Sequence, residues 1–185
     1  MTAFSPEQSN TSIESVKIGD RAPDFELISD SDSRWRLSDH DGNVRVLLFY
    51  PQNETLVCTK QLCSVRDHWR EYLETKAEIV GVSPSSPNEN IEFSQRRSLP
   101  MPLLADPGRV VTGIFSRHWI YPIQLTRAIV VIDAHGIVRT RMVMLRAFRP
   151  KDDDVITAIY AARIDALNEK STAIRSRAFK VFNKS

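Results

Sequence analysis

The sequence predicts an α/β fold in which a central mixed β-sheet is flanked by helices. Nearly continuous apolar runs, such as residues 44–50, are typical of strands that are buried on both faces of a sheet. Between these runs lie segments whose apolar residues recur three or four positions apart, which is the spacing of amphipathic helices. Proline and glycine mark many of the junctions. Strands and helices therefore alternate along the chain, as they do in α/β proteins.

The composition is that of an ordinary globular domain. The chain has 185 residues, of which 42% are hydrophobic and 26% charged, and this excludes a disordered polymer, a collagen-like fibre and a disulfide-dense mini-protein. Its longest apolar runs have about five residues, far fewer than the ~20 that cross a bilayer. The net charge of +2 is too balanced to indicate nucleic-acid binding. We expect one domain over residues 17–167 and no membrane span.

The first half of that domain predicts a hairpin, a buried strand and a long helix. Residues 25–28 and 34–37 predict the hairpin, because a turn-rich segment joins two short strand-like runs. Residues 44–50 predict the buried strand, which Pro51 ends. A helix over residues 59–75 is predicted next. Its apolar positions, spaced three or four apart, are Leu62, Val65, Trp69, Tyr72 and Leu73.

The middle of the chain alternates strand and helix. Residues 77–82 predict a strand and residues 87–98 a helix, after which two prolines frame a short extended segment that ends at residue 104. Asp106 is predicted to cap a further helix over residues 107–115, with proline at the first helical position.

The domain closes with a hairpin and a helix. Residues 127–133 and 137–143 predict two strands, because a turn ending at Gly136 separates them. The closing helix is predicted over residues 150–167. The order β-α-β-α-β-β-α is that of a thioredoxin-like fold, here preceded by an N-terminal β-hairpin.

The two ends of the chain differ from the domain. Residues 1–16 are rich in Ser, Thr, Gln and Asn and predict a flexible leader, with the features of neither a secretory signal nor a transit peptide. We therefore expect a cytoplasmic protein. Residues 168–185 are basic, and Ile174, Ala178 and Val181 recur at helical spacing. They predict an extra amphipathic C-terminal helix that packs on the body or, alternatively, contacts a partner.

The only two cysteines, Cys58 and Cys63, lie five residues apart. In a reducing compartment such a pair indicates redox or metal chemistry more than a permanent disulfide. Cys58 falls where the predicted helix begins, and the unpaired N–H groups and dipole of that end favour a thiolate over a thiol. Thr55 can direct its hydroxyl at the sulfur, and Pro51 shields the loop. Cys58 is therefore the candidate nucleophile.

Helix geometry separates the two sulfurs. Cys58 shares the core-facing side of the predicted helix with Leu62, whereas Cys63 shares the polar side with Asp67 and Arg70. Helical residues five apart are about 140° out of phase, with Cα atoms roughly 8–9 Å apart. A disulfide needs a separation below ~7 Å. A bond between these cysteines therefore requires the first turns of the helix to unwind, which suits a redox cycle better than a structural crosslink.

Several segments carry a resemblance to a known family. The pattern Pro51-x-x-x-Thr55-x-x-Cys58 resembles the active-site signature of the peroxiredoxins, and residues 58–67 resemble their peroxiredoxin Q (bacterioferritin comigratory protein) branch. The resemblance covers residues 17–162. Further matches to the family's opening, its mid-chain segment and its arginine-bearing strand are residues 18–25, 99–106 and 127–133.

The resemblance implies a thiol-dependent peroxidase that reduces hydrogen peroxide and organic hydroperoxides. Cys58 would be the peroxidatic thiolate and become a sulfenic acid. Thr55 and the backbone amide of Cys58 would bind the peroxide, Pro51 would shield it, and Arg127 would stabilise the thiolate and the leaving oxygen. Cys63 would resolve the sulfenic acid as a disulfide that thioredoxin or a similar dithiol reduces. No metal or other cofactor is implied, and the branch favours a monomer, with a weak homodimer as the alternative.

The sequence departs from the family pattern at a few positions. Leu56 and Val57 stand where the family usually has Pro-Gly, and Gln61 stands where many members have Glu. Valine does not reach positive φ as glycine does, so the loop is expected to be less pliable.

Other hypotheses stay open at this point. The chain could be a redox-sensing or partner-binding protein of the same fold with little turnover, or a protein-disulfide oxidoreductase, although it lacks Cys-x-x-Cys. Cys58, Cys63 and His68 could bind zinc, but their spacing matches no common zinc site. Cys63 could be a bystander, and Arg127 could form a salt bridge at the edge of the sheet.

Overall fold

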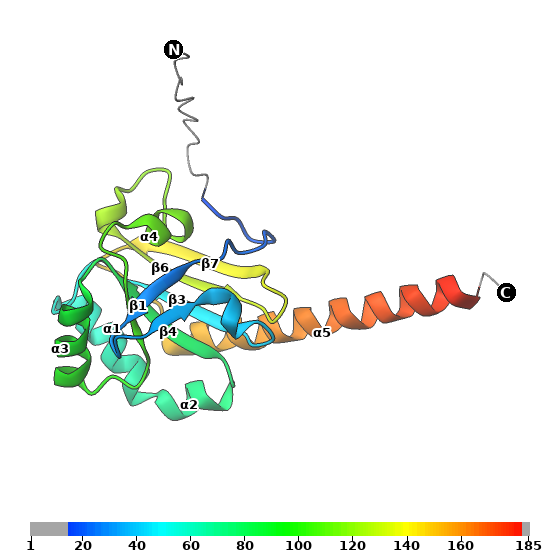
Figure 1. Ribbon diagram of the computed structural model, residues 1–185, viewed down its shortest axis with the longest axis horizontal. Helices are drawn as coiled ribbons and strands as arrows, with labels where there is room; N and C mark the ends of the chain where they lie inside the picture. The colour runs from blue at the N-terminus through cyan, green and yellow to red at the C-terminus, as the bar shows by residue number, and fades with distance from the viewer. Residues whose placement is uncertain (1–14, 183–185) are drawn as a thin grey trace, which may run out of the picture.

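The computed structural model describes residues 15–182, and the side chains of residues 15–172. Its centre is a mixed sheet of seven strands in the order β2-β1-β5-β4-β3-β6-β7 (Figure 1). The central strands β5, β4 and β3 run parallel, and β6 and β7 join β3 antiparallel. The predicted α/β fold with its N-terminal hairpin is therefore confirmed. The strands are β1 Glu26–Ser29, β2 Arg34–Arg36, β3 Arg45–Phe49, β4 Glu78–Ser83, β5 Leu103–Ala105, β6 Thr126–Ile132 and β7 Val138–Leu145.

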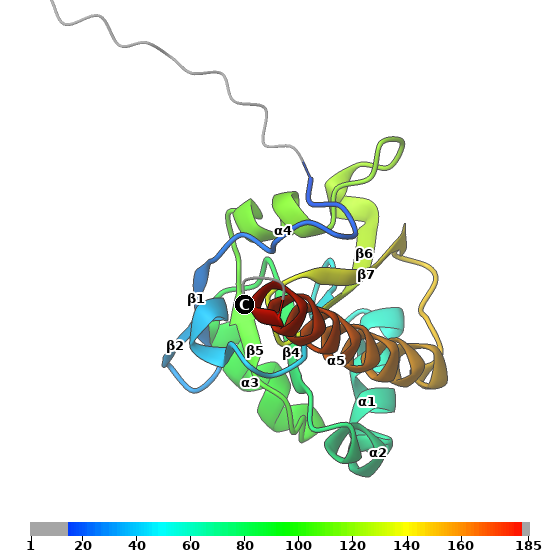
Figure 2. The same cartoon turned by 90° about the vertical axis from the view of Figure 1, so that its right-hand side faces the viewer.

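Helices cover both faces of the sheet (Figure 2). The α-helices are α1 Leu56–Asp67, α2 Trp69–Glu74, α3 Pro87–Arg97, α4 Val110–Phe115 and α5 Asp152–Phe182, and the 3-10 helices are η1 Leu37–His40 and η2 Ile123–Leu125. Alternate residues of β3 point to opposite faces. Val46 and Leu48 enter a core with residues of α1, α2, α3 and α5, whereas Leu47 and Phe49 enter a second core with α4. The fully apolar strand pattern reflects this burial on both sides.

The helix expected over residues 59–75 begins earlier and is broken in two. It starts at Leu56, which places Cys58 inside its first turn, and it is interrupted at His68 between α1 and α2. Asp152, the first residue of α5, lies at the interruption. Its carboxylate accepts hydrogen bonds from the hydroxyls of Ser64 (2.5 Å) and Tyr72 (2.8 Å). A contact across eighty or more residues thus marks a break that the local apolar spacing does not reveal.

Asp106 caps α4, but it lies further from the start of the helix than the sequence predicts. Asp106 does not stand next to the helix, because a turn through Arg109 (φ 52°) intervenes and α4 begins at Val110. Asp106 nevertheless satisfies the free end of the helix. Its carboxylate accepts from the N–H of Val110 (3.0 Å), the N–H of Thr112 (2.7 Å) and the hydroxyl of Thr112 (2.6 Å).

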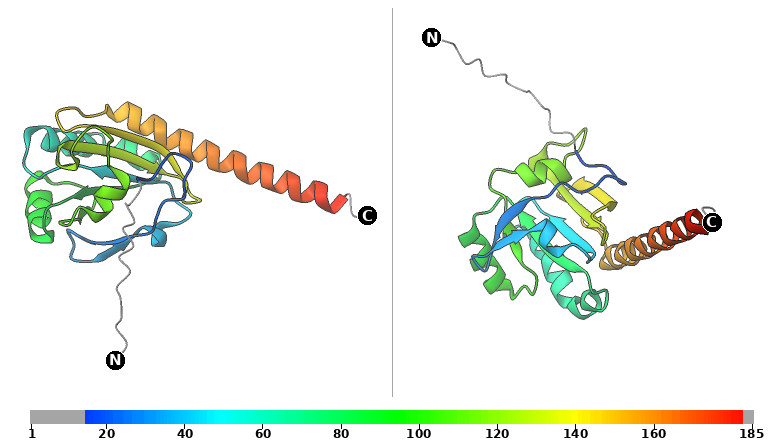
Figure 3. Two further views of the ribbon diagram at one scale, coloured as in Figure 1. Left: turned by 90° about the horizontal axis from the view of Figure 1, so that it is seen from above. Right: turned by 45° about the vertical axis from the view of Figure 1, so that its right-hand side comes forward.

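The C-terminal segment does not form a helix separate from the closing one. A single helix, α5, runs from Asp152 to Phe182 and projects away from the body (Figures 1 and 3). Ala166 is the last buried residue among its described side chains, and residues 167–172 are exposed. These residues bury no side chain, but Glu169 forms an ion pair with Arg139 of β7 at 2.6 Å, so packing of the extension on the body stays a prediction. The predicted flexible leader lies outside the described residues, apart from its last two positions.

Candidate active site

The candidate nucleophile sits at the end of a buried strand. The chain leaves β3 at Phe49, passes through the buried Pro51 and enters α1 at Leu56. Thr55 is the N-cap residue, with φ −78° and ψ 147°, but its hydroxyl makes no capping hydrogen bond. That hydroxyl therefore stays available beside the first turn, which contains Cys58.

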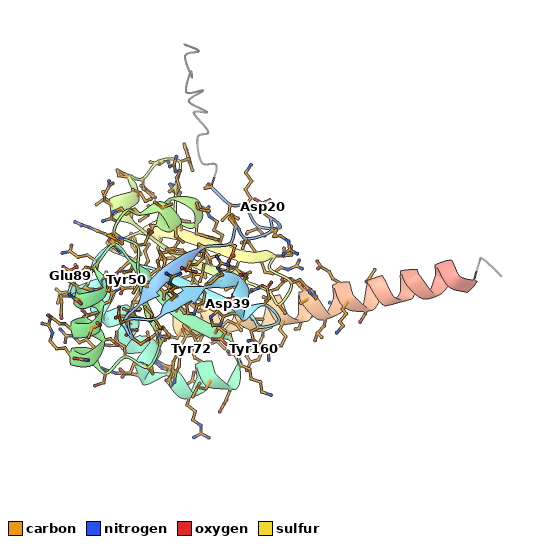
Figure 4. All side chains as sticks on the ribbon, in the orientation of Figure 1. Asp20, Asp39, Tyr50, Tyr72, Glu89 and Tyr160 are labelled. Atoms are coloured by element: carbon orange, nitrogen blue, oxygen red, sulfur yellow. The ribbon has the colours of Figure 1, made fainter. Side chains whose placement is uncertain are left out.

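Helix α3 holds the loop between β3 and α1 in place. The Asn53 side chain donates hydrogen bonds to the side-chain oxygen of Asn90 (3.0 Å) and to the carbonyl of Glu89 (3.3 Å). Glu54 has φ 58° and forms ion pairs with Arg96 (3.4 Å) and Arg97 (2.7 Å). Figure 4 shows Tyr50 and Glu89 on the side of the molecule where α1 and α3 meet. Sequence reasoning missed this anchoring, because its partners lie far apart in the chain.

Cys58 and Arg127 are in direct contact inside the protein. Cys58 faces the core, as predicted, and is 1% exposed, while Arg127 on β6 is 0% exposed. One terminal nitrogen of Arg127 (Nη2) donates a hydrogen bond to the Cys58 sulfur at 3.1 Å. The other (Nη1) donates to the side-chain oxygen of Gln61, three residues after Cys58 and also buried. Gln61 was not among the predicted site residues, although its spacing from Cys58 places it on a neighbouring face of the helix.

The electrostatics of this contact are unusual, because the buried guanidinium has no carboxylate partner among the residues whose side chains are described. A charge removed from water is costly unless it is paired and hydrogen-bonded. Of the two groups that Arg127 contacts, the Gln61 amide stays neutral, whereas Cys58 can become an anion. Among the described side chains, Cys58 is therefore the one group in contact with this cation that can balance its charge. Because β6 lies between β3 and β7, Arg127 is not part of a salt bridge at the edge of the sheet.

Cys63 lies on the other side of α1. It is partly exposed, as predicted, and both cysteines are free thiols. Two guanidiniums are close enough for its charge to act on them. The pKa of Arg97 is raised first by its hydrogen bond to Glu54 and in smaller part by Cys63, and the pKa of Arg66 is raised first by its hydrogen bond to Asp67 and in smaller part by Cys63. Two cations therefore lie on the side of α1 that carries Cys63.

A pocket opens beside the first turn of α1. It has a volume of about 350 Å³ and lies between that turn of the helix and the turn that follows β7. Leu56 and Val57, two of the departures from the family pattern, supply apolar wall here. The full lining is Pro51, Gln52, Thr55, Leu56, Val57, Arg146 and Ala147.

The structure does not assemble the zinc site considered above. Within residues 15–172, no three His, Cys, Asp or Glu side chains gather where a metal ion could bind. His68 turns to the Ser64 carbonyl, to which its Nδ1 donates at 2.9 Å, and this hydrogen bond is the main reason that the His68 pKa is raised. In the described part of the chain, no helix is both long enough and apolar enough to cross a membrane.

The fold and the site together define a thioredoxin-like protein whose first-turn cysteine faces a buried arginine. Residues 18–141 match the AhpC/TSA family. The chain is 41% identical over 91 residues to peroxiredoxin Bcp of Bacillus subtilis, covering 49% of this chain and 58% of that protein. It is 32% identical over 151 residues to the chloroplastic peroxiredoxin Q of Sedum lineare, covering 79% and 78%.

Among solved structures, the chain resembles the peroxidoxin BcpB of Mycobacterium tuberculosis, with a TM-score of 0.67 and 30% identity over 80% of this chain and 98% of that one. The chain belongs to the AhpC/TSA family, in its peroxiredoxin Q branch. The predicted thioredoxin-like fold and the resemblance to the peroxiredoxins are thereby confirmed. The chain spans less than two thirds of the length of several curated relatives that it matches.

Proposed function

We propose that this protein is a thiol-dependent peroxidase that reduces hydrogen peroxide and organic hydroperoxides. The observation that carries the proposal is the hydrogen bond from Arg127 to the sulfur of Cys58, made by a buried guanidinium for which the described residues offer no carboxylate. Membership of the peroxiredoxin Q branch supports the same activity.

In the first step, the Cys58 thiolate attacks the terminal oxygen of the hydroperoxide. A sulfur–oxygen bond forms and the O–O bond breaks, so that sulfur is oxidised to sulfenic acid and the peroxide is reduced. The leaving alkoxide or hydroxide takes a proton from water. Arg127 stabilises the thiolate and then the charge on the leaving oxygen. Thr55 and the backbone N–H of Cys58 hold the peroxide oxygens, and Pro51 keeps bulk water away.

In the second step, Cys63 resolves the sulfenic acid. Its thiolate attacks the Cys58 sulfur, a disulfide forms, and hydroxide leaves and becomes water. The cysteines occupy different sides of α1, so the first turns of the helix unwind before the sulfurs meet. Thioredoxin or a similar dithiol then reduces the disulfide by exchange, and no metal or other cofactor takes part.

Assembly and location are parts of the same proposal. We place the active form as a monomer or a weak homodimer, which sedimentation over a range of concentrations tests. Two free cysteines suit a reducing compartment, and we place the protein in the cytoplasm, which fractionation tests. The plant relatives are named as chloroplastic proteins, so a plastid fraction belongs in that experiment.

Mass spectrometry after one equivalent of hydrogen peroxide tests the cycle. The expected product is the protein with two hydrogens fewer and a Cys58–Cys63 crosslink in its peptide map. Cys63→Ser should instead give a sulfenic acid at Cys58 that a dimedone probe captures. Rapid disulfide formation without sustained turnover in the presence of thioredoxin would favour the redox-sensor hypothesis, and no oxidation of Cys58 would contradict the proposal.

A further inference from the structure

The turn that follows β7 places a cation in the pocket beside the first turn of α1. The Arg146 N–H donates a hydrogen bond to the carbonyl of Leu125 at 2.7 Å, which ties the turn to the segment leading into β6. Arg127 on β6 is paired in register with Met144 on β7, two residues before Arg146. Arg146 and Ala147 then line the same pocket as Pro51 and Thr55. The position of Arg146 relative to the reacting sulfur is therefore set by the sheet.

The positive charge of Arg146 is not balanced by an ion pair with any residue that the structure describes. The side chain is exposed, and the other residues that line the pocket are neutral. The Asp152 carboxylate, at the start of α5, is already engaged by Ser64, Tyr72 and Arg149. A guanidinium presents several N–H donors in a plane that suits a carboxylate. Arg146 is thus available to an anionic group that enters the pocket.

The rest of the pocket suits an apolar body. Leu56 is 80% exposed, and Val57 and Ala147 extend its apolar surface. The pocket volume of about 350 Å³ is within the range of sites that bind small organic ligands. Hydrogen peroxide has no apolar surface to bury, so a wall of this kind gives it no advantage. An organic hydroperoxide, by contrast, gains from burying its hydrocarbon part.

We propose that this pocket selects organic hydroperoxides that carry a carboxylate, with Arg146 as the group that binds the anion. The hydrocarbon part lies on Leu56, Val57 and Ala147, and the peroxide end points past Thr55 to Cys58. The inference rests on the proposed peroxidase function and deepens it. The chemistry is unchanged, since Cys58 becomes a sulfenic acid and the substrate leaves as the corresponding hydroxy acid.

The test uses a pair of substrates that differ in charge. Cumene hydroperoxide bearing a para-carboxylate is compared with its methyl ester, at neutral pH and under identical reducing conditions. The wild-type protein should show a kcat/KM for the acid about tenfold above that for the ester, as expected for a charge-assisted hydrogen bond. Arg146→Gln should bring that ratio close to one.

Arg149→Gln is the matched control, because Arg149 is an arginine three residues further on that pairs with Asp152 at 3.9 Å and does not line the pocket. It should keep the wild-type ratio. The proposal would be overturned if the wild-type ratio were near one, or if the Arg146→Gln ratio equalled that of the wild type. It would also be overturned if Arg149→Gln lost selectivity to the same extent as Arg146→Gln.

A binding measurement separates this inference from the peroxidase itself. Calorimetry with the unreactive alcohol product that carries the para-carboxylate should show binding to the wild type that is about tenfold weaker in Arg146→Gln. If hydrogen peroxide is not consumed yet this product binds through Arg146, the peroxidase proposal fails and the anion site stands. If hydrogen peroxide is consumed but neither binding nor selectivity depends on Arg146, the peroxidase proposal stands and the anion site fails.

Discussion

A terminal nitrogen of Arg127 lies 3.1 Å from the sulfur of Cys58, and both side chains are shut off from solvent. The other terminal nitrogen of the guanidinium donates a hydrogen bond to the neutral side-chain amide of Gln61. A cation buried without a carboxylate destabilises a fold unless the group beside it can carry a negative charge. The fold therefore pairs this cysteine with an arginine sixty-nine residues away.

Replacing Arg127 should lower both activity and stability. In Arg127→Met, the Gln61 amide and the Cys58 sulfur lose a buried hydrogen-bond partner, so the free energy of unfolding should fall. The rate of peroxide reduction should fall by about 10²–10³-fold, because the stabilising charge for the transition state is gone. Denaturant unfolding and single-turnover peroxide kinetics measure the two effects. A variant that keeps its rate would show that Arg127 is structural only.

The two cysteines should have different kinetic roles. Cys58→Ser should abolish peroxide reduction altogether. Cys63→Ser should keep the rate of the first oxidation, because Cys63 does not contact Arg127, but lose sustained turnover with thioredoxin. Stopped-flow measurement of the first oxidation and a coupled steady-state assay distinguish these effects. Full steady-state turnover in Cys63→Ser would point to a mechanism with one cysteine.

The ion pairs of Glu54 should govern how readily α1 unwinds. Glu54→Gln removes the contacts with Arg96 and Arg97 that hold the loop on α3. Local opening should become more frequent, so Cys63 should reach Cys58 sooner and less sulfinic acid should accumulate under excess peroxide. Peptide mass spectrometry of Cys58 measures that fraction. Glu92→Gln is the control, since Glu92 pairs with Arg96 at 3.2 Å but does not contact the loop; an equal change there would contradict this interpretation.

The capping box of α3 should make stability depend on pH in the acid range. The Glu89 carboxylate accepts hydrogen bonds from the N–H (2.7 Å) and hydroxyl (2.8 Å) of Ser86, and the backbone bond is the main reason that the Glu89 pKa is lowered. A pKa lowered by folding contributes stability above its unfolded value, and the contribution is lost as pH falls through the folded value.

Glu89→Gln should therefore lower the melting temperature at neutral pH, because the neutral amide accepts hydrogen bonds less strongly than the carboxylate does. The difference from the wild type should shrink towards zero as the wild-type carboxyl becomes protonated. Thermal unfolding over a series of pH values measures it. A difference that stays constant down to acid pH would show that the charge of Glu89 is not involved.

The projecting part of α5 should be dispensable for the fold. Residues 167–172 bury no side chain, although Glu169 pairs with Arg139 at 2.6 Å. A chain that ends after Lys170 keeps that pair and the buried Ala166. Its melting temperature and peroxide kinetics should equal those of the full chain. A clear loss of stability would mean that the removed segment packs on the domain or on a second copy.

The sequence predicts the sheet and helices well where apolar spacing reflects burial. The strand over residues 44–50 is one case, because β3 is covered on both faces. The break at His68 and the displaced start of α4 were not predictable in this way. Each depends on a carboxylate, Asp152 or Asp106, whose hydrogen bonds have no signature in apolar spacing.

The candidate site follows the same rule. The structure brings the predicted Cys58 and Arg127 into contact, whereas Pro51 and Thr55 line a pocket beside the first turn of α1 and Cys63 lies on the other side of the helix. Gln61 and the contacts of the loop with α3 were missed, because hydrogen-bond partners more than thirty residues apart cannot be paired from one sequence. The sequence signal that could have indicated Gln61 is a polar residue one turn after the nucleophile, beside the core-facing side of the predicted helix.

The ultraviolet absorbance of thiolates, compared between the reduced wild type and Cys58→Ser at neutral pH, tests the central claim most directly. The account predicts that the wild type shows the absorbance of one additional thiolate, and that one equivalent of hydrogen peroxide removes it. Equal absorbance in the two proteins, or a signal that persists after peroxide is added, would contradict it.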